Sequence, residues 1–165
     1  MTETQRLWAP WRTAYLRHSR GAAPKGCVFC VAKRARDDRR VQVVARGRQV
    51  FALLNRYPYN VGHLMVAPYR HVGDLVALRP DERTELFEET TRMISVLQRA
   101  VHAQGVNLGL NMGRAAGAGI PGHLHMHLVP RWVGDTNFMP VIGKTKVMSQ
   151  SLDAMYDLLI RTQRR

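Results

Sequence analysis

The chain has 165 residues, enough for one domain to bury a single hydrophobic core without disulfides or metal. Hydrophobic residues make up 45% and charged residues 22%, a balance that excludes disordered and fibrous proteins. Lys and Arg total 25 against 12 Asp and Glu, and the resulting formal charge of +13 attracts polyanions. Nucleic acid and a polyphosphate substrate fit this charge equally well, and solubility alone also explains it.

The N-terminal part of the sequence predicts an irregular arm over residues 1–26, which is rich in Trp, Pro and Gly. Its first stretch, MTETQRLWAPWR, lacks the apolar core of a secretion signal. No apolar run in the sequence approaches the roughly 20 residues that a membrane span needs. We therefore expect a cytoplasmic protein that spans no membrane.

A short charged helix is predicted over residues 31–40, directly after the two cysteines of the chain. Cys27 and Cys30 stand in the motif C-V-F-C. In a chain of the cytoplasm this spacing indicates metal binding or redox chemistry rather than a structural disulfide.

Three strands are predicted next. The β-prone runs 41–45 and 50–54 flank the turn-like Arg46-Gly47-Arg48, a pattern typical of a hairpin. Tyr57-Pro58-Tyr59-Asn60 then interrupts the chain, and residues 62–67 predict a third strand.

The clearest helix begins at Pro80-Asp81-Glu82, because proline suits a first helical turn and acidic side chains favour the positive end of the helix dipole. Apolar residues then recur at the three-to-four spacing of a half-buried helix, with Thr90 among them: Leu86, Met93, Leu97 and Val101.

The remaining sequence predicts strands over 106–112 and 123–129, a loop over the glycine-rich residues 113–119, and a last helix over 152–162. That helix has its apolar residues on one face: Leu152, Met155 and Leu159. These elements predict an α+β domain of two layers, an antiparallel sheet with helices packed on it, and we expect residues 1–165 to form this single domain.

The most informative segment is the run of alternating histidines at 123–129. On a strand, side chains alternate between faces, so His123, His125 and His127 share one face while the intervening apolar residues pack in the core. Three imidazoles on one face indicate either metal ligation or nucleophilic and acid–base chemistry. The glycine-rich loop before them can aim backbone N–H groups at an anion, and Asn111 adds a donor. A histidine nucleophile beside a phosphate site implies phosphorus chemistry.

His-x-His-x-His followed by apolar residues resembles the signature of the histidine-triad family of nucleotide hydrolases and transferases. The segment FALLNRYPYNVGHLMVAPYRHVGDL is similar to the branch that cleaves dinucleoside polyphosphates, which includes the fragile histidine-triad proteins. The segment NMGRAAGAGIPGHLHMHLVPRWVGDTNFMPV is similar to bacterial members related to diadenosine tetraphosphate phosphorylases. The similarity runs from about residue 7 to residue 159 and implies the histidine-triad fold.

The resemblance also implies roles for individual residues. The middle histidine of the motif, His125, matches the nucleophile that accepts the nucleotidyl group, and His127 matches the histidine that contacts the phosphate. His63 lies where the family places a further histidine near the site. Asn55 matches the position that binds ribose hydroxyls, and Asn111 that of a phosphate-contacting asparagine.

The glycine-rich loop departs from the family pattern. In many relatives a Gln, Ser or Thr side chain at its end contacts the phosphate, whereas this chain has Gly117-Ala118-Gly119-Ile120 there. We expect the backbone N–H groups of Gly117, Ala118 and Gly119 to bind the phosphate instead.

A structural zinc site is the second implication of the resemblance. Some bacterial histidine-triad proteins, and the related galactose-1-phosphate uridylyltransferases, hold zinc with a Cys-x-x-Cys pair, a distant histidine and the first histidine of the triad. The matching residues are Cys27, Cys30, His71 and His123. Two thiolates and two imidazoles form a closed tetrahedral site. Alternatively, the cysteines pack as small hydrophobes and His123 only orients His125.

The function implied is cleavage of an adenine nucleotide or dinucleoside polyphosphate, such as diadenosine tetraphosphate, through a nucleotidyl-His125 intermediate. If water is the second acceptor, the enzyme is a hydrolase, and if phosphate is the acceptor, it is a phosphorylase. The segment PRW-x-GDTNF favours the phosphorylase. The alternatives are an adenosine phosphoramidase and a nucleotide- or nucleic-acid-binding protein without turnover. The favoured function requires no nucleic acid, and by analogy with the family we expect a homodimer.

Overall fold

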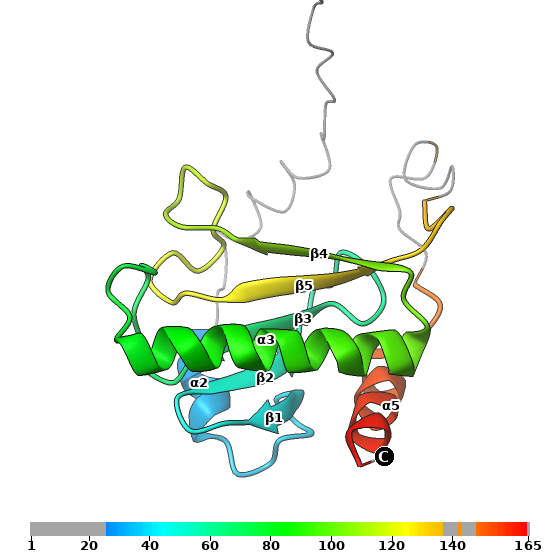
Figure 1. Ribbon diagram of the computed structural model, residues 1–165, viewed down its shortest axis with the longest axis horizontal. Coiled ribbons are helices and arrows are strands. Elements are labelled where there is room, and N and C mark those ends of the chain that lie inside the picture. The colour runs from blue at the N-terminus through cyan, green and yellow to red at the C-terminus, as the bar shows by residue number, and fades with distance from the viewer. Residues whose placement is uncertain (1–25, 137–141, 143–147, 165) are drawn as a thin grey trace, which may run out of the picture.

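The computed structural model of the protein describes residues 26–136, 142 and 148–164. Five strands form one sheet in the order β1-β2-β3-β5-β4, and every neighbouring pair is antiparallel (Figure 1). The strands are β1 (Val43–Arg46), β2 (Val50–Leu54), β3 (Leu64–Pro68), β4 (Gly105–Leu110) and β5 (Met126–Arg131). The helices are α2 (Val28–Arg34), α3 (Pro80–Val101) and α5 (Leu152–Gln163). The predicted α+β class, an antiparallel sheet with helices on it, is confirmed.

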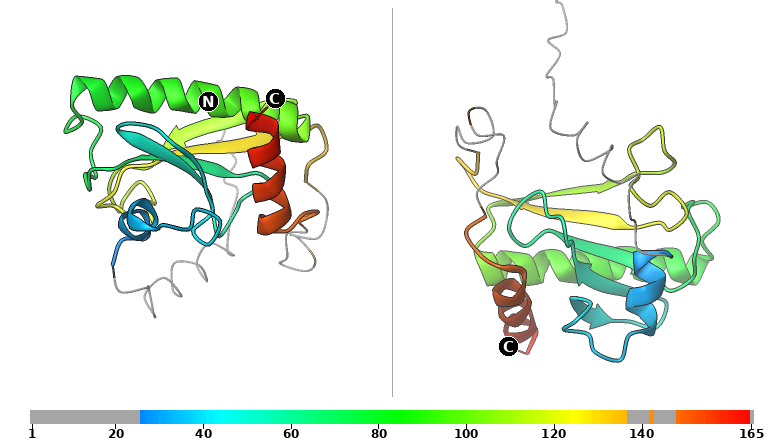
Figure 2. Two further views of the ribbon diagram at one scale, coloured as in Figure 1. Left: turned by 90° about the horizontal axis from the view of Figure 1, so that it is seen from below. Right: turned by 180° about the vertical axis from the view of Figure 1, so that it is seen from behind.

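Helices cover both faces of the sheet. Figure 2 shows α3 along one face, α2 against the other, and α5 beside the sheet, where it contacts α3 and β1. The side chains of β2 and β3 alternate between two apolar clusters. One cluster, on the α3 side, includes Val50, Ala52, Leu54, Leu64 and Val66. The other, on the α2 side, includes Phe29, Phe51, Leu53, Met65 and Ala67. The two central strands are therefore buried on both faces.

The apolar stripe predicted on α3 faces the sheet. Leu86, Met93 and Leu97 are fully buried, and the Thr90 hydroxyl donates to the Leu86 carbonyl at 2.7 Å, which satisfies this buried polar group. Val101 is half-buried and packs against the same cluster. None of the helices within the described ranges is both long and apolar enough to cross a membrane.

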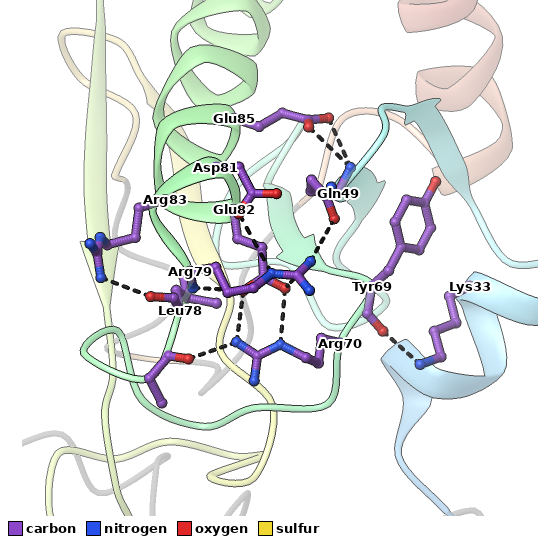
Figure 3. Close-up of polar contacts among 11 residues, drawn as sticks. Lys33, Gln49, Tyr69, Arg70, Leu78, Arg79, Asp81, Glu82, Arg83 and Glu85 are labelled. Carbon is purple, nitrogen blue, oxygen red and sulfur yellow. Dashed lines mark hydrogen bonds and ion pairs between the residues drawn. The ribbon is translucent and has the colours of Figure 1, made fainter.

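An ion pair between the buried Glu82 and the partly exposed Arg70 fixes the start of α3 (Figure 3). The side chain of Glu82 is 1% exposed and accepts from Arg70 Nε at 3.0 Å and from the Arg79 backbone N–H at 2.8 Å. Its hydrogen bond with Arg70 lowers the pKa of Glu82 to about 2, so the carboxylate stays charged. One turn later, Glu85 accepts from the Gln49 N–H at 3.0 Å. These bonds tie the helix to the β1–β2 hairpin and to the loop that follows β3.

The helix predicted over 31–40 is wrong at both ends, because α2 spans Val28–Arg34 and residues 35–40 are irregular, with a turn at 38–40. Ala35 is extended, and Asp37 Oδ1 accepts from the Arg40 N–H at 3.1 Å. Asp38 is drawn to Arg46 of β1, with 2.9 Å between Oδ1 and Nε. Aspartates that bond nearby backbone or side-chain donors compete with helix formation.

The strand predicted to begin at His123 begins three residues later, at Met126. The His123 N–H donates to the Ile120 carbonyl and the Leu124 N–H to the Val72 carbonyl, so neither amide joins the sheet ladder. The alternation nevertheless holds, since Leu124, Met126 and Leu128 all enter the cluster beneath α3. The other predicted bounds agree with the structure to within two residues, but the irregular arm predicted over 1–26 lies almost wholly outside the described residues.

Candidate active site

Four histidines lie on the α2 side of the sheet, opposite the apolar residues with which the triad alternates. His63 and His123 are fully buried, His125 is 6% exposed and His127 is half-buried. The ring centroids of His125 and His127 are 4.7 Å apart, and those of His127 and His63 are 5.1 Å apart. The fold therefore brings His63, His125 and His127 into one cluster.

The tautomer of His125 follows from its backbone contact. Its Nδ1 lies 2.8 Å from the His123 carbonyl, which can only accept, so Nδ1 carries the proton and Nε2 carries the lone pair. Burial lowers the pKa of His125, which keeps the ring neutral at pH 7. The ring of Phe29 lies 4.7 Å from that of His125 and closes the site on the α2 side. His125 is thus a neutral imidazole with a defined nucleophilic nitrogen.

A second chain of hydrogen bonds sets the tautomer of His127. The Tyr59 N–H donates to His63 Nδ1 at 3.1 Å, so the proton of neutral His63 is on Nε2. That Nε2–H donates to His127 Nδ1 at 2.9 Å, which leaves the His127 proton on Nε2. Burial, with a smaller effect of the neighbouring imidazoles, lowers the pKa of His63 to about 3 and that of His127 to about 4. His127 is therefore a neutral hydrogen-bond donor beside the ring of His125.

The two candidate asparagines border this cluster. Asn55 Nδ2 lies 3.4 Å from His63 Nδ1, and Asn55 Oδ1 accepts from the Tyr57 N–H at 2.9 Å. Leu110 pairs with Met126 at the end of β4, which places the next residue, Asn111, beside the register position of His125.

Residues 113–119 form a loop, as predicted, and two backbone N–H groups of this loop bond within it. The Gly117 N–H donates to the Arg114 carbonyl at 3.0 Å and the Ala118 N–H to the Gly113 carbonyl at 3.3 Å. Gly119 is exposed. Of the three backbone N–H groups predicted to bind phosphate, that of Gly119 is therefore the candidate in this conformation.

A cluster of four candidate metal ligands joins this site on the α2 side. Cys27 Sγ is 3.3 Å from His123 Nδ1, Cys30 Sγ is 3.3 Å from His71 Nδ1, and the two imidazole Nδ1 atoms are 3.2 Å apart. All four ligand atoms lie within 4.8 Å of one another. Bond lengths of about 2.0–2.3 Å around tetrahedral zinc correspond to ligand separations of roughly 3.3–3.8 Å. The three distances above match this range, as does the 3.8 Å between Cys30 Sγ and His123 Nδ1.

The tautomer of His123 also suits a metal. Its Nε2 lies 2.8 Å from the Pro68 carbonyl and therefore carries the proton, so that Nδ1, which faces the sulfur atoms, has the lone pair. Burial lowers the pKa of His123 to about 4 and raises that of the Cys27 thiol. Two cysteines and two histidines at these separations are a donor set that fits a closed zinc site.

The chain is similar to known proteins over most of its length. The family model for the HIT domain, the histidine-triad domain, matches residues 37–133. A Mycobacterium tuberculosis protein named AP-4-A phosphorylase is 44% identical over 156 residues, which are 91% of this chain and 80% of that protein. The chain belongs to the HIT family.

Two solved structures resemble this HIT protein in fold. A hypothetical histidine triad nucleotide-binding protein from Sulfolobus tokodaii has a TM-score of 0.68 and 26% identity, over 84% of this chain and 92% of its own. A Zn-bound histidine triad family protein from Mycobacterium smegmatis has a TM-score of 0.67 and 25% identity, over 84% of this chain and 94% of its own.

The structure adds three contributors that the sequence analysis did not single out for the site. Phe29 packs on both His123 and His125, with centroids 5.0 and 4.7 Å away. The Pro68 carbonyl sets the His123 tautomer, and Tyr59 contacts His63 through its amide and its ring. A signal existed for two of them, because Phe29 stands inside the C-V-F-C motif and Tyr59 inside the segment that interrupts the strands.

Proposed function

We propose that this HIT protein transfers a nucleotidyl group from a dinucleoside polyphosphate, such as diadenosine tetraphosphate, first to His125 and then to phosphate. The observation that carries the proposal is the bond from His125 Nδ1–H to the His123 carbonyl, which leaves Nε2 as a nucleophile in a neutral, buried ring. The M. tuberculosis relative, named AP-4-A phosphorylase, supports the substrate and the acceptor.

In the first step, His125 Nε2 attacks the α-phosphorus. A P–N bond forms, the P–O bond to the polyphosphate breaks, and ATP leaves when the substrate is diadenosine tetraphosphate. The His127 Nε2–H donates to an oxygen of the transferring group, where negative charge develops. Because His63 holds His127 in this tautomer, the donor needs no rearrangement before the reaction.

In the second step, an oxygen of phosphate or water attacks the same phosphorus, the P–N bond breaks, and its electron pair returns to His125 Nε2. A proton carried by the attacking oxygen is released to solvent. Phosphate as acceptor gives ADP, whereas water gives AMP. Asn55 binds the ribose of the transferred nucleotide, and Asn111 with the Gly119 amide binds its phosphate oxygens.

Product analysis with diadenosine tetraphosphate tests this function. With phosphate, we expect ATP and ADP, with an ADP-to-AMP ratio that rises with phosphate concentration, since both acceptors share one intermediate. A flat ratio with AMP throughout means a hydrolase. Faster cleavage of an adenosine phosphoramidate favours a phosphoramidase, and tight DNA binding without cleavage of any nucleotide contradicts an enzyme.

We also propose that Cys27, Cys30, His71 and His123 hold a structural zinc ion. Their separations, the His123 tautomer and the Zn-bound M. smegmatis relative support this. Zinc would link α2 and the loop after β3 to the segment that carries His125.

Metal analysis of protein purified without added metal tests the zinc proposal, with about one zinc per chain expected. We expect Cys30→Ser to lose the metal and to lower Tm, because metal binding adds to folding free energy. Val31→Ser, at an exposed position of the same helix, is the matched control and should keep both. Metal-free protein whose Tm does not respond to Cys30→Ser contradicts the site.

We further propose that the chain is one HIT domain and acts as a cytoplasmic homodimer. β4 supports the dimer, because it is an edge strand of the sheet and carries the exposed Leu108. Sedimentation equilibrium measures the state directly.

A further inference from the structure

An exposed aromatic ring stands at the rim of the histidine cluster, and the proposed chemistry leaves it without a role. The ring of Tyr59 lies 4.6 Å from that of His63 and 5.9 Å from that of His127, stacked on the latter at 30°. It is 48% exposed although it touches two histidines that are buried or half-buried. One face of the ring therefore packs on the site while much of the rest faces solvent.

Hydrogen bonds of Tyr59 and of the next residue hold the Tyr59 backbone in place. Its own N–H donates to His63 Nδ1 at 3.1 Å. The next residue, Asn60, is buried and donates from Nδ2 to the Pro130 carbonyl at 3.0 Å and to Asp135 Oδ2 at 2.9 Å. The ring is thus presented by a backbone that is anchored to β5 and to the turn after it. A preorganised aromatic ring loses little conformational entropy when a planar ligand stacks on it.

The rings of His125, His127 and Tyr59 lie in a series that runs from the buried part of the site towards solvent. From His125 to His127 the centroid distance is 4.7 Å, and from His127 to Tyr59 it is 5.9 Å. Exposure rises along the same series, from 6% at His125 to 48% at Tyr59. A leaving group that extends from the phosphorus at His125 past His127 and out to solvent can therefore reach the Tyr59 ring.

We propose that Tyr59 is a stacking site for the distal nucleobase of the substrate, the base of the nucleotide that leaves in the first step. This inference rests on the proposed function and names the part of the substrate that the histidines do not touch. Every nucleobase has a π-face on which an aromatic ring can stack, so the stacking does not depend on the hydrogen-bonding groups of the base. The site would therefore favour substrates that carry a second nucleoside but would not distinguish one base from another.

The test compares two compounds with the same number of phosphates. Diadenosine tetraphosphate carries the distal adenosine, and adenosine 5′-tetraphosphate lacks it. Their dissociation constants are measured by calorimetry in the inactive His125→Asn background, with and without Tyr59→Ala, and KM and kcat are measured in the active chain. We expect Tyr59→Ala to weaken diadenosine tetraphosphate about tenfold, which corresponds to about 1.4 kcal/mol. We expect adenosine 5′-tetraphosphate to bind as before.

Two further variants sharpen the result. Tyr59→Phe keeps the ring and should keep the preference for the dinucleotide, because stacking needs no hydroxyl. Tyr57→Ala removes a more exposed tyrosine from the same loop, and the preference should again be unchanged. Exchange of the distal adenine for guanine should change affinity little.

Equal loss of both compounds in Tyr59→Ala overturns the proposal, because the ring then acts on the proximal nucleotide or on the histidines. Unchanged affinity for both overturns it as well. Binding that discriminates as expected, in a chain that cleaves neither compound, supports the stacking site and contradicts the proposed reaction. Failure of both compounds to bind contradicts the reaction and the stacking site together.

Discussion

The two faces of the sheet use the same strands for different purposes. Under α3, the side chains of β2, β3 and β5 form one apolar cluster that needs only matching volume. On the α2 side, the apolar cluster ends at four histidines, whose rings need hydrogen-bond partners at defined atoms. The α3 side therefore contributes to the stability of the domain alone, whereas the α2 side also holds buried histidine rings whose protons have assigned positions.

Removal of the proposed nucleophile should abolish catalysis while leaving the stability of the domain intact. We expect His125→Ala to lower kcat by at least about 10⁴-fold, because the atom that forms the bond to phosphorus is lost. The fold should remain, with cooperative unfolding and an intact far-UV circular dichroism spectrum. His127→Ala should lower kcat less, since it removes a donor rather than the nucleophile. A His125→Ala enzyme with near-normal kcat would contradict the covalent mechanism.

A substitution on the opposite face of β5 should lower stability and leave catalysis unchanged. Leu128 is fully buried, and we expect Leu128→Ala to lower the free energy of unfolding by about 2–5 kcal/mol. The activity of the folded fraction should stay near that of the parent. Urea denaturation measures the first quantity and titration of active sites the second. Val76→Ala, at a position 85% exposed, is the control and should change stability by less than about 0.5 kcal/mol. Loss of specific activity in folded Leu128→Ala would show that the two faces are not independent.

The buried imidazoles also predict acid sensitivity on the α2 side. The pKa of His63 falls from 6.5 to about 3 on folding, mainly through burial, so the unfolded chain binds the proton more readily. The stability that neutral His63 contributes is complete above about pH 6.5 and is lost as the pH falls towards about 3. Between pH 7 and pH 5, one such group accounts for about 2 kcal/mol. Urea denaturation at these two values should show a smaller difference for His63→Asn than for the parent. Equal differences would contradict a neutral, buried His63.

The smallest effect is expected at the ion pair that starts α3. We expect Glu82→Gln to lower the free energy of unfolding by about 1–1.5 kcal/mol at pH 7, because charge-assisted bonds to Arg70 become neutral ones. Since folding lowers the pKa of Glu82 to about 2, this contribution is present above about pH 4.5 and disappears as the pH falls towards 2. Asp81→Asn is the matched control, because Asp81 is 57% exposed and its pairing with Arg79 spans 3.5 Å. Thermal melts at pH 7 and pH 3 compare the variants, and equal effects of both changes at pH 7 would contradict the role of burial.

Local patterns in the sequence determined most of the secondary structure. A β-prone run beside a turn predicted β2 at its observed bounds, and proline with two acidic residues predicted the start of α3 at Pro80. These signals are local properties of the sequence. Alternation within the triad also predicted which side chains enter the core. The roles of His125, His127 and Asn55 came from the resemblance to the HIT family and remain proposals.

The ends of α2, the hydrogen-bond partners of the histidines and the position of Tyr59 depend on tertiary contacts. Asp38 bonds to Arg46 instead of continuing the predicted helix. His63 contacts His127, which is 64 residues away in the sequence, and Cys27 contacts His123, which is 96 residues away. Alternation along a strand assigns a side chain to a face but does not say which donor or acceptor from another segment will reach it. The tautomers of His123 and His127 depend on such partners, Pro68 and His63, so the chemistry of these rings is a property of the assembled sheet rather than of the motif.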